Sequence, residues 1–153
     1  MRLLRLDTAM LFCCAIAATV SCAPAPEPEE ALRQWLESAE AAAEDKDRPR
    51  LMKMISASYV DARGNDRSGI DRILRLLFLR VSEVALVSKI DELTIAGDSA
   101  ANVRLTSGLA GRNGGSRFGL SGDVYRFELE LEMEGGDWLL IGARWGKLGE
   151  DLR

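Results

Sequence analysis

One stretch, residues 124–145, constrains the fold more than any other because it alternates apolar and charged side chains. The apolar residues take every second position: Tyr125, Phe127, Leu129, Leu131 and Met133. This period of two is typical of an antiparallel strand that has one face on a core and the other in water. Gly135 and Gly136 suit a tight two-residue turn, so residues 137–145 are expected to return as a second strand.

The returning strand is apolar on both of its predicted faces. Simple alternation places Leu139, Ile141, Ala143 and Trp145 on one side, and Trp138, Leu140, Gly142 and Arg144 on the other. A strand that is covered on both faces requires further elements against the sheet. The first half of the chain supplies them as helices.

Three helices are expected before the sheet. The first begins near Pro28 and the second is short, with Pro49 in its first turn, where the missing N–H costs nothing. The third follows residues 68–71, which have the form of a capping box. Leu76 and Leu79 widen its apolar stripe, so we expect this helix to be covered on more than one side.

Further strands are expected around the central hairpin. Residues 84–95 read as a strand with a bulge near Asp91, residues 101–106 as its neighbour and residues 56–61 as a brief extended piece. The six glycines of residues 108–122 predict a long flexible hairpin loop, since the phosphate-loop order is missing and no helix follows. The fold class is therefore α+β, with three N-terminal helices packed on a strongly curved, mostly antiparallel sheet of about four strands.

Composition excludes several functions. The 153 residues suffice for one domain, and the absence of histidine excludes histidine-based catalysis and the common zinc sites. The cysteines all lie at the start of the chain: Cys13, Cys14 and Cys22. No metal site, cofactor or disulfide is therefore expected in the folded part. The net charge of −4 gives no basis for nucleic-acid binding.

The N-terminus reads as a lipoprotein signal peptide over residues 1–21. Arg2 and Arg5 precede a short apolar run, and Ala18-Thr19-Val20-Ser21-Cys22 resembles a bacterial lipobox, in which the cysteine becomes the lipidated first residue. Residues 22–28, rich in proline, would form an extended tether. The alternatives are an ordinary signal peptide cut nearby and a hydrophobic anchor with an incidental cysteine. Lipidation implies a bacterial cell envelope, and Ala23 after the cysteine favours the periplasmic face of the outer membrane.

Three groups of residues, taken in order, resemble the nuclear transport factor 2-like superfamily, also called the cystatin-like α+β cone. They are Tyr59-Val60-Asp61 with Gly64, Gly97-Asp98 with Ala101 and Val103, and Asp137-Trp138 with Ile141 and Trp145. The resemblance covers a domain at residues 29–148, followed by a tail at residues 149–153. It implies a bent sheet around a cone-shaped pocket, but the superfamily includes ketosteroid isomerase, scytalone dehydratase, transport factors and accessory domains, so it does not choose a function.

Two sets of candidate site residues follow. Asp61 with Tyr59 is the one pair that could act as an acid or base beside a donor, and the alternative is a solvated acid beside a turn. The ligand-binding candidates are Trp35, Tyr59, Phe78, Phe127, Trp138 and Arg144. The aromatic members also suit a plain core, and Arg144 reaches a pocket only if its face of the strand lines one.

Two functions remain open. We favour a membrane-anchored envelope lipoprotein whose cone binds an apolar small molecule or a partner protein. The alternative is a small cofactor-independent isomerase, dehydratase or hydrolase that uses Asp61 and Tyr59. A monomer is preferred over a homodimer, because the glutamates between residues 128 and 134 would repel their copies across the open sheet face.

Overall fold

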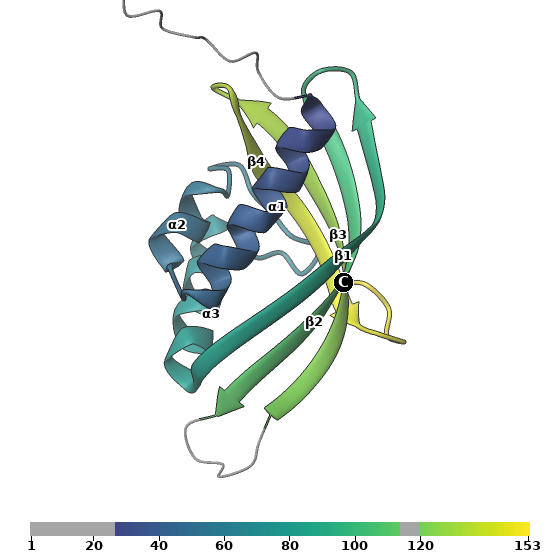
Figure 1. Ribbon diagram of the computed structural model, residues 1–153. Coiled ribbons are helices and arrows are strands. Elements are labelled where there is room, and N and C mark those ends of the chain that lie inside the picture. Colours follow the sequence, from purple (N-terminus) through teal and green to yellow (C-terminus); the bar gives the residue numbers. More distant parts are fainter. Residues whose placement is uncertain (1–26, 114–119) are drawn as a thin grey trace, which may run out of the picture.

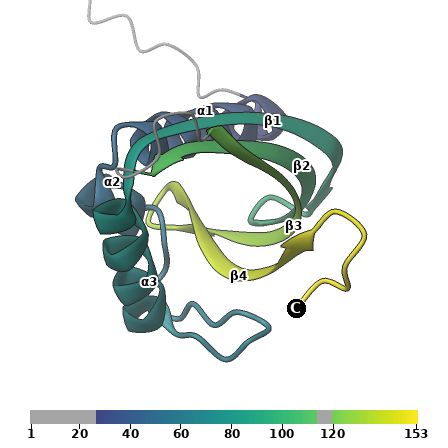
Figure 2. The ribbon, with the colours of Figure 1, turned by 90° about the horizontal axis from the view of Figure 1, so that it is seen from below.

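The computed structural model describes residues 27–113 and 120–153, so the leader and Cys22 lie outside the described residues. Its elements are α1 (Pro28–Glu44), α2 (Arg48–Lys53), α3 (Arg67–Arg80), β1 (Val81–Ala96), β2 (Ala100–Asn113), β3 (Leu120–Glu134) and β4 (Asp137–Lys147). The strands form one antiparallel sheet in the order β1-β2-β3-β4. The sheet curves strongly and the helices lie against its concave side (Figures 1 and 2), which confirms the α+β class. Within the described ranges, none of the helices combines the length and hydropathy that crossing a membrane requires.

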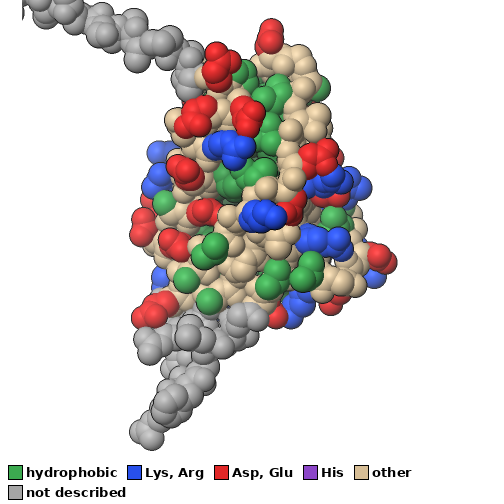
Figure 3. Space-filling model, turned by 45° about the vertical axis from the view of Figure 1, so that its right-hand side comes forward, with side chains coloured by type: hydrophobic (Ala, Val, Ile, Leu, Met, Phe, Trp, Pro, Cys, Tyr) green, Lys and Arg blue, Asp and Glu red, His purple; other side chains and the backbone are tan. Residues whose placement is uncertain are grey.

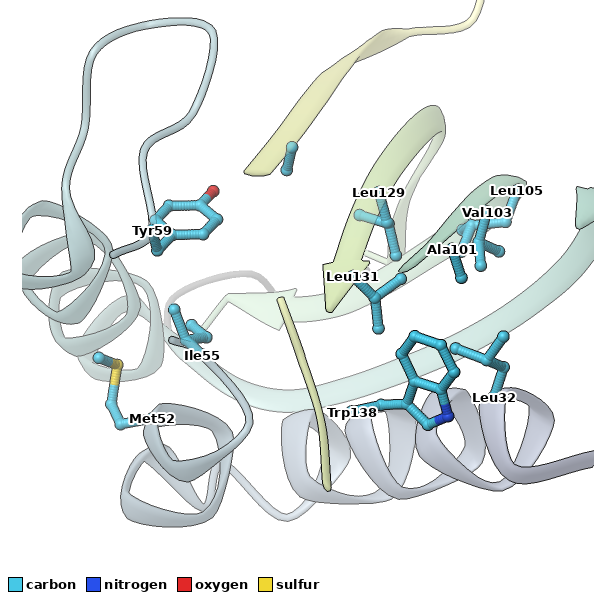
Figure 4. Close-up of a cluster of buried hydrophobic side chains, with 11 residues drawn as sticks. Leu32, Met52, Ile55, Tyr59, Ala101, Val103, Leu105, Leu129, Leu131 and Trp138 are labelled. Carbon is cyan, nitrogen blue, oxygen red and sulfur yellow. The ribbon is translucent and has the colours of Figure 1, made fainter. Parts of the chain in front are cut away.

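The core lies between α1, the segment after α2 and the concave face of the sheet (Figure 4). Its buried members are Leu32, Met52, Ile55, Tyr59, Ala101, Val103, Leu105, Leu129, Leu131, Trp138 and Ala143. The alternation predicted for β3 is confirmed, since Leu129 and Leu131 are buried and the glutamates beside them point away from the core. The predicted bulge of β1 is also present, as a register shift between Ile90 and Glu92.

The cap of α3 differs from the prediction. The capping box was placed at Ser68, but the helix begins at Arg67 and its N-cap is Asp66, whose carboxylate accepts from the Gly69 N–H at 2.7 Å. The Ser68 hydroxyl donates to the same carboxylate at 2.8 Å. A carboxylate one position before the helix is the stronger acceptor for the free N–H groups, so it displaces the serine from the capping role.

The expected covering of α3 on more than one side is wrong for this chain. Ile70 and Leu74 pack against the core, whereas Leu76 and Leu79 are 54% and 77% exposed. The reason is topological: α3 contacts α2 and β1 on one side, and no described element reaches its other side.

Alternation assigned the faces of β4 incorrectly, because the strand contains a bulge. Glu130 pairs with Gly142 and Leu131 pairs with Leu140, which leaves Ile141 as an extra residue. One extra residue inverts the phase of every side chain beyond it. The concave face therefore receives Trp138 and Leu140 from one part of β4 and Ala143 and Trp145 from the other.

The glycine-rich stretch is mostly strand and not the predicted loop. β2 continues to Asn113 and β3 begins at Leu120, so only residues 114–119 between them lie outside the described residues. Gly108, for example, pairs with Val87 on one side and Val124 on the other. Glycine has a low propensity for strands, but its backbone N–H and C=O can still pair with a neighbouring strand. Because β1 is long, it provides that neighbour, and the glycines are held in the sheet.

The outer edge of β4 is covered by the segment that links α2 and α3. The N–H groups of Ser56, Val60 and Ala62 donate to Leu140, Ile141 and Ala143 carbonyls at 3.0 to 3.1 Å. The brief extended piece expected at residues 56–61 is thus an edge segment with isolated bridges and not a regular strand. Further along, Trp145 and Arg153 exchange two backbone hydrogen bonds, so the C-terminal residues also cover this edge.

The N-cap of α3 leads to a pH-dependent prediction. Hydrogen bonds from the Gly69 N–H and the Ser68 hydroxyl hold the pKa of Asp66 below its ordinary value of 3.8. The ionised cap therefore adds stability above that ordinary pKa, and this contribution is lost as the pH falls through the lower pKa of the folded state. We expect Asp66→Ala to lower the free energy of unfolding at pH 7, measured with urea, and the difference from the wild type to shrink in acid. Ser68→Ala is the control and should have a smaller effect; a larger effect, or a pH-independent difference, would contradict the assignment.

Candidate functional site

The edge segment beside β4 positions the predicted pair Tyr59 and Asp61. Its hydrogen bonds to Leu140, Ile141 and Ala143 hold the backbone on either side of them. Tyr59 is 2% exposed and points into the core, as Figure 4 shows, and Asp61 is 5% exposed. Both residues are therefore buried, and Tyr59 belongs to the core cluster.

The Asp61 carboxylate is engaged by its own loop. One oxygen accepts from the backbone N–H groups of Arg63 and Asn65, both at 2.8 Å, and the other accepts from the Asn65 side-chain amide at 2.8 Å. The turn also needs the left-handed conformation of Gly64, whose φ is +78°. These contacts give Asp61 a role in organising residues 61–65.

Tyr59 carries a proton at any physiological pH. Burial raises the pKa of its phenol far above the ordinary value, and the neighbouring Asp61 charge raises it further. The phenol is therefore a hydrogen-bond donor and not a base. The pair has one neutral donor and one carboxylate that already accepts three hydrogen bonds.

A polar row crosses the lower half of the concave face, below the apolar core. Cross-strand pairing places its four members side by side, one from each strand: Ser88, Ser107, Tyr125 and Lys147. The Ser88 hydroxyl donates to the Ser107 hydroxyl at 3.0 Å, and Ser107 is 3% exposed. Lys147 lies at the open end of the row, where its ion pair with Asp123 at 3.1 Å raises its pKa.

Half-buried aromatic rings adjoin the polar row. Phe127 and Trp145 are cross-strand partners on the same face, and the Tyr125 and Phe127 ring centres are 6.2 Å apart. The guanidinium of Arg63 lies over the Trp145 ring, 4.5 Å from the ring centre. Hydroxyl groups beside aromatic surface suit the binding of a small molecule with a polar group on an apolar body.

Three buried polar atoms in the described chain have no hydrogen-bond partner. They are the indole nitrogens of Trp35 and Trp138 and one carboxylate oxygen of Glu40. Trp35 and Glu40 belong to α1, the helix that covers the concave face, and the Trp138 ring lies beside Leu32 of the same helix (Figure 4). An unsatisfied buried group of this kind costs about 1–3 kcal/mol.

The ligand-binding candidates named from the sequence separate into two groups. Trp35, Tyr59, Phe127 and Trp138 belong to the core cluster or pack against it, and Phe78 is half-buried on α3. Arg144 points away from the concave face, because the bulge at Ile141 shifts the phase of β4, and it pairs with Glu128 at 2.6 Å. Arg144 therefore does not share the face of Trp138 and Leu140, as its nomination required, and instead lines a small hollow on the convex face.

Surface hollows lie elsewhere and contain charges that are already paired. A hollow of about 670 Å³ between α2 and α3 contains the Arg48–Asp71 ion pair. One of about 240 Å³ on the convex face contains Arg104 paired with Glu92, and acidic and basic side chains are similarly interspersed on the face in Figure 3. Among the described residues, no group of histidine, cysteine or acidic side chains could hold a metal ion. The polar row with its aromatic neighbours is the better candidate site.

Sequence reasoning missed Ser88, Ser107 and Glu40. The sequence does indicate the two serines, because each takes a core-facing position of its strand where the alternating pattern calls for an apolar residue. Finding them required the register, which pairs two such positions across the strands. Nothing in the sequence distinguishes Glu40 from the other glutamates of α1.

No protein-family model matches the sequence, and no curated protein matches it. Solved structures do match. A scytalone dehydratase-like protein from Novosphingobium aromaticivorans has a TM-score of 0.70 at 10% identity, covering 78% of this chain and 83% of that one. A ketosteroid isomerase-like protein from Erwinia carotovora atroseptica has 0.64 at 12%, covering 78% and 95%.

A protein of unknown function from Shewanella oneidensis, described as nuclear transport factor 2-like, has a TM-score of 0.63 at 18% identity. The match covers 76% of this chain and 97% of that one. At such identities the likeness concerns the fold, and it agrees with the element order, the curved sheet and the helices on its concave side. The described chain therefore folds as a nuclear transport factor 2-like domain.

Proposed function

We propose that this protein is a bacterial envelope lipoprotein whose domain binds a small molecule at the lower half of its concave face. The observation that carries the binding role is the Ser88–Ser107 hydroxyl pair, of which Ser107 is buried, next to half-buried aromatic rings. A purely structural face would not need hydroxyl groups there, because apolar side chains satisfy packing without them.

The envelope location is proposed from the sequence. The lipobox-like residues ending at Cys22 lie five positions before the first described residue, Glu27. The folded domain begins directly at Pro28, so the segment between them is short and would hold the domain close to the membrane. Several acyl chains on one cysteine would give a stable anchor.

An enzyme remains the second candidate. Tyr59 and Asp61 are both buried, two residues apart on the edge segment, and several similar folds carry enzyme names. Against this reading, the hydrogen bonds to the Asp61 carboxylate all come from residues 63 and 65 of its own loop. We therefore favour binding over catalysis.

Removal of the proposed lipid attachment site tests the location. Cys22→Ala should abolish acylation, detected by mass spectrometry or by incorporation of labelled fatty acid, and should move the protein out of the membrane fraction. Cys14→Ala, a change of the same residue type within the predicted leader, is the control and should leave both properties unchanged. An alanine variant at Cys22 that is still acylated and membrane-bound would overturn the proposal.

The binding role predicts a molecule that co-purifies with the chain. Organic extraction followed by mass spectrometry should find it in the wild type, and Tyr125→Ala should reduce it roughly 3- to 10-fold, in line with the loss of one aromatic contact. Val124→Ala is a matched control, because Val124 is the preceding residue of β3 and faces the convex side, where it is 41% exposed. Equal amounts in both variants, or no bound molecule in the wild type, would count against the proposal.

The two readings of Asp61 predict opposite effects on stability. If the carboxylate organises the loop, Asp61→Ala should lower the free energy of unfolding by about 2–3 kcal/mol, because three donors lose their acceptor. A catalytic carboxylate is held at a cost to stability, so its removal should be neutral or stabilising. Urea unfolding decides between them, and a neutral or stabilising result would favour the enzyme.

A further inference from the structure

The exposed large apolar side chains are concentrated on α3. Four of the eight in the described chain belong to this helix: Ile73, Leu76, Leu77 and Leu79, with exposures of 42%, 54%, 37% and 77%. Of the others, Val60 lies on the edge segment, Val87 and Val124 flank Gly108 on the convex face, and Leu148 follows β4. A group of exposed apolar side chains on one helix, such as this one on α3, marks a surface that contacts a partner molecule or a membrane.

These side chains share one outward face of the helix. At 100° per residue, Ile73, Leu76, Leu77 and Leu79 fall within an arc of about 160° together with Arg72 and Arg80. Ile70 and Leu74 lie next to this arc, beyond Leu77, and face the core. Asp71 lies on the flank next to α2, where it pairs with Arg48.

The outward face is also basic. Arg75 borders the arc on its other side, and neither Arg75 nor Arg80 makes a hydrogen bond or ion pair in the described structure; Arg72 donates only to the Ser68 hydroxyl, at 3.3 Å. The single acid of α3, Asp71, is already neutralised by Arg48. A protein with a net charge of −4 thus presents one helix on which leucines lie among three arginines, two of them without a partner in the described structure.

We infer that the outward face of α3 docks the domain onto an anionic phospholipid surface. Arginine binds lipid phosphate, and leucine and isoleucine enter the region between headgroups and acyl chains, which is the combination found in helices that lie on membranes. A second copy of this chain fits less well, because a symmetric contact between two α3 helices would oppose Arg72, Arg75 and Arg80 to themselves.

The residues that precede Glu27 also favour a phospholipid surface as the partner of α3. A lipid anchor at Cys22 would keep a bilayer within reach of the domain at all times, and six extended residues from Cys22 to Glu27 span about 19 Å. α1 begins at its end away from α3 (Figure 1), and its 17 residues are about 26 Å long. The domain would therefore lie on its side, with α3 against the lipid.

Vesicle sedimentation with the chain from Glu27 onward tests the contact without the anchor. This part contains all the described elements and the whole core cluster, so it is a packed unit on its own. We expect it to sediment with vesicles of phosphatidylglycerol and phosphatidylcholine in equal parts, to remain in solution with phosphatidylcholine alone, and to dissociate as salt is added. Failure to bind the anionic vesicles, or equal binding to both kinds, overturns the proposal.

Paired variants locate the surface. Arg75→Gln with Arg80→Gln should lower partitioning about fivefold for each arginine, and Leu76→Ser with Leu79→Ser should lower it as well.

Lys53→Gln with Arg126→Gln removes the same charge from α2 and the convex face, and should leave partitioning nearly unchanged. Equal losses in the arginine pair and this control would mean that net charge alone acts, and would overturn the assignment to α3. Light scattering that shows the leucine variant converting a dimer to a monomer would overturn it too, in favour of a second copy.

Discussion

The backbone hydrogen bonds along both edges of β4 are the constraint on which the rest of the structure depends. On one edge β4 pairs with β3, and on the other it binds the segment between α2 and α3 through Ser56, Val60 and Ala62. The helical half of the chain is thereby fastened to the sheet by main-chain contacts that do not depend on side-chain identity. Because this edge is covered, it is also closed to pairing with other chains.

The same contacts account for the hydrogen bonds that the Asp61 carboxylate accepts. A segment that runs along a strand edge must then turn away toward α3, and the buried turn leaves backbone N–H groups that need acceptors. The Asp61 carboxylate accepts from two of them, at Arg63 and Asn65. Arg67 continues this arrangement, since its guanidinium donates to the Ile55 carbonyl at 3.0 Å and so joins the start of α3 to the end of the α2 region.

The two faces of the sheet have different tasks. On the convex face, charges of opposite sign alternate across the strands, as in the pairs Arg104–Glu92 and Arg144–Glu128, which keeps this face hydrated. On the concave face, an apolar upper half packs against α1 and gives way to the row of Ser88, Ser107, Tyr125 and Lys147. The apolar packing against α1 is thus confined to the upper half, so the lower half is free to carry polar groups.

The sequence by itself determined the elements whose pattern is local. The alternation of β3, the apolar stripe of α1 and the turn at Gly135 and Gly136, with φ of +63° and +97°, were all predicted because each depends on spacing within one element. Only the tertiary structure decided the faces of β4, where one extra residue at Ile141 turned Arg144 outward, and the strand character of Gly108, which its neighbours impose. The candidate site belongs to this second group. Ser88 and Ser107 stand 19 residues apart and meet through strand register alone, and register is a property of the paired strands that neither strand encodes separately.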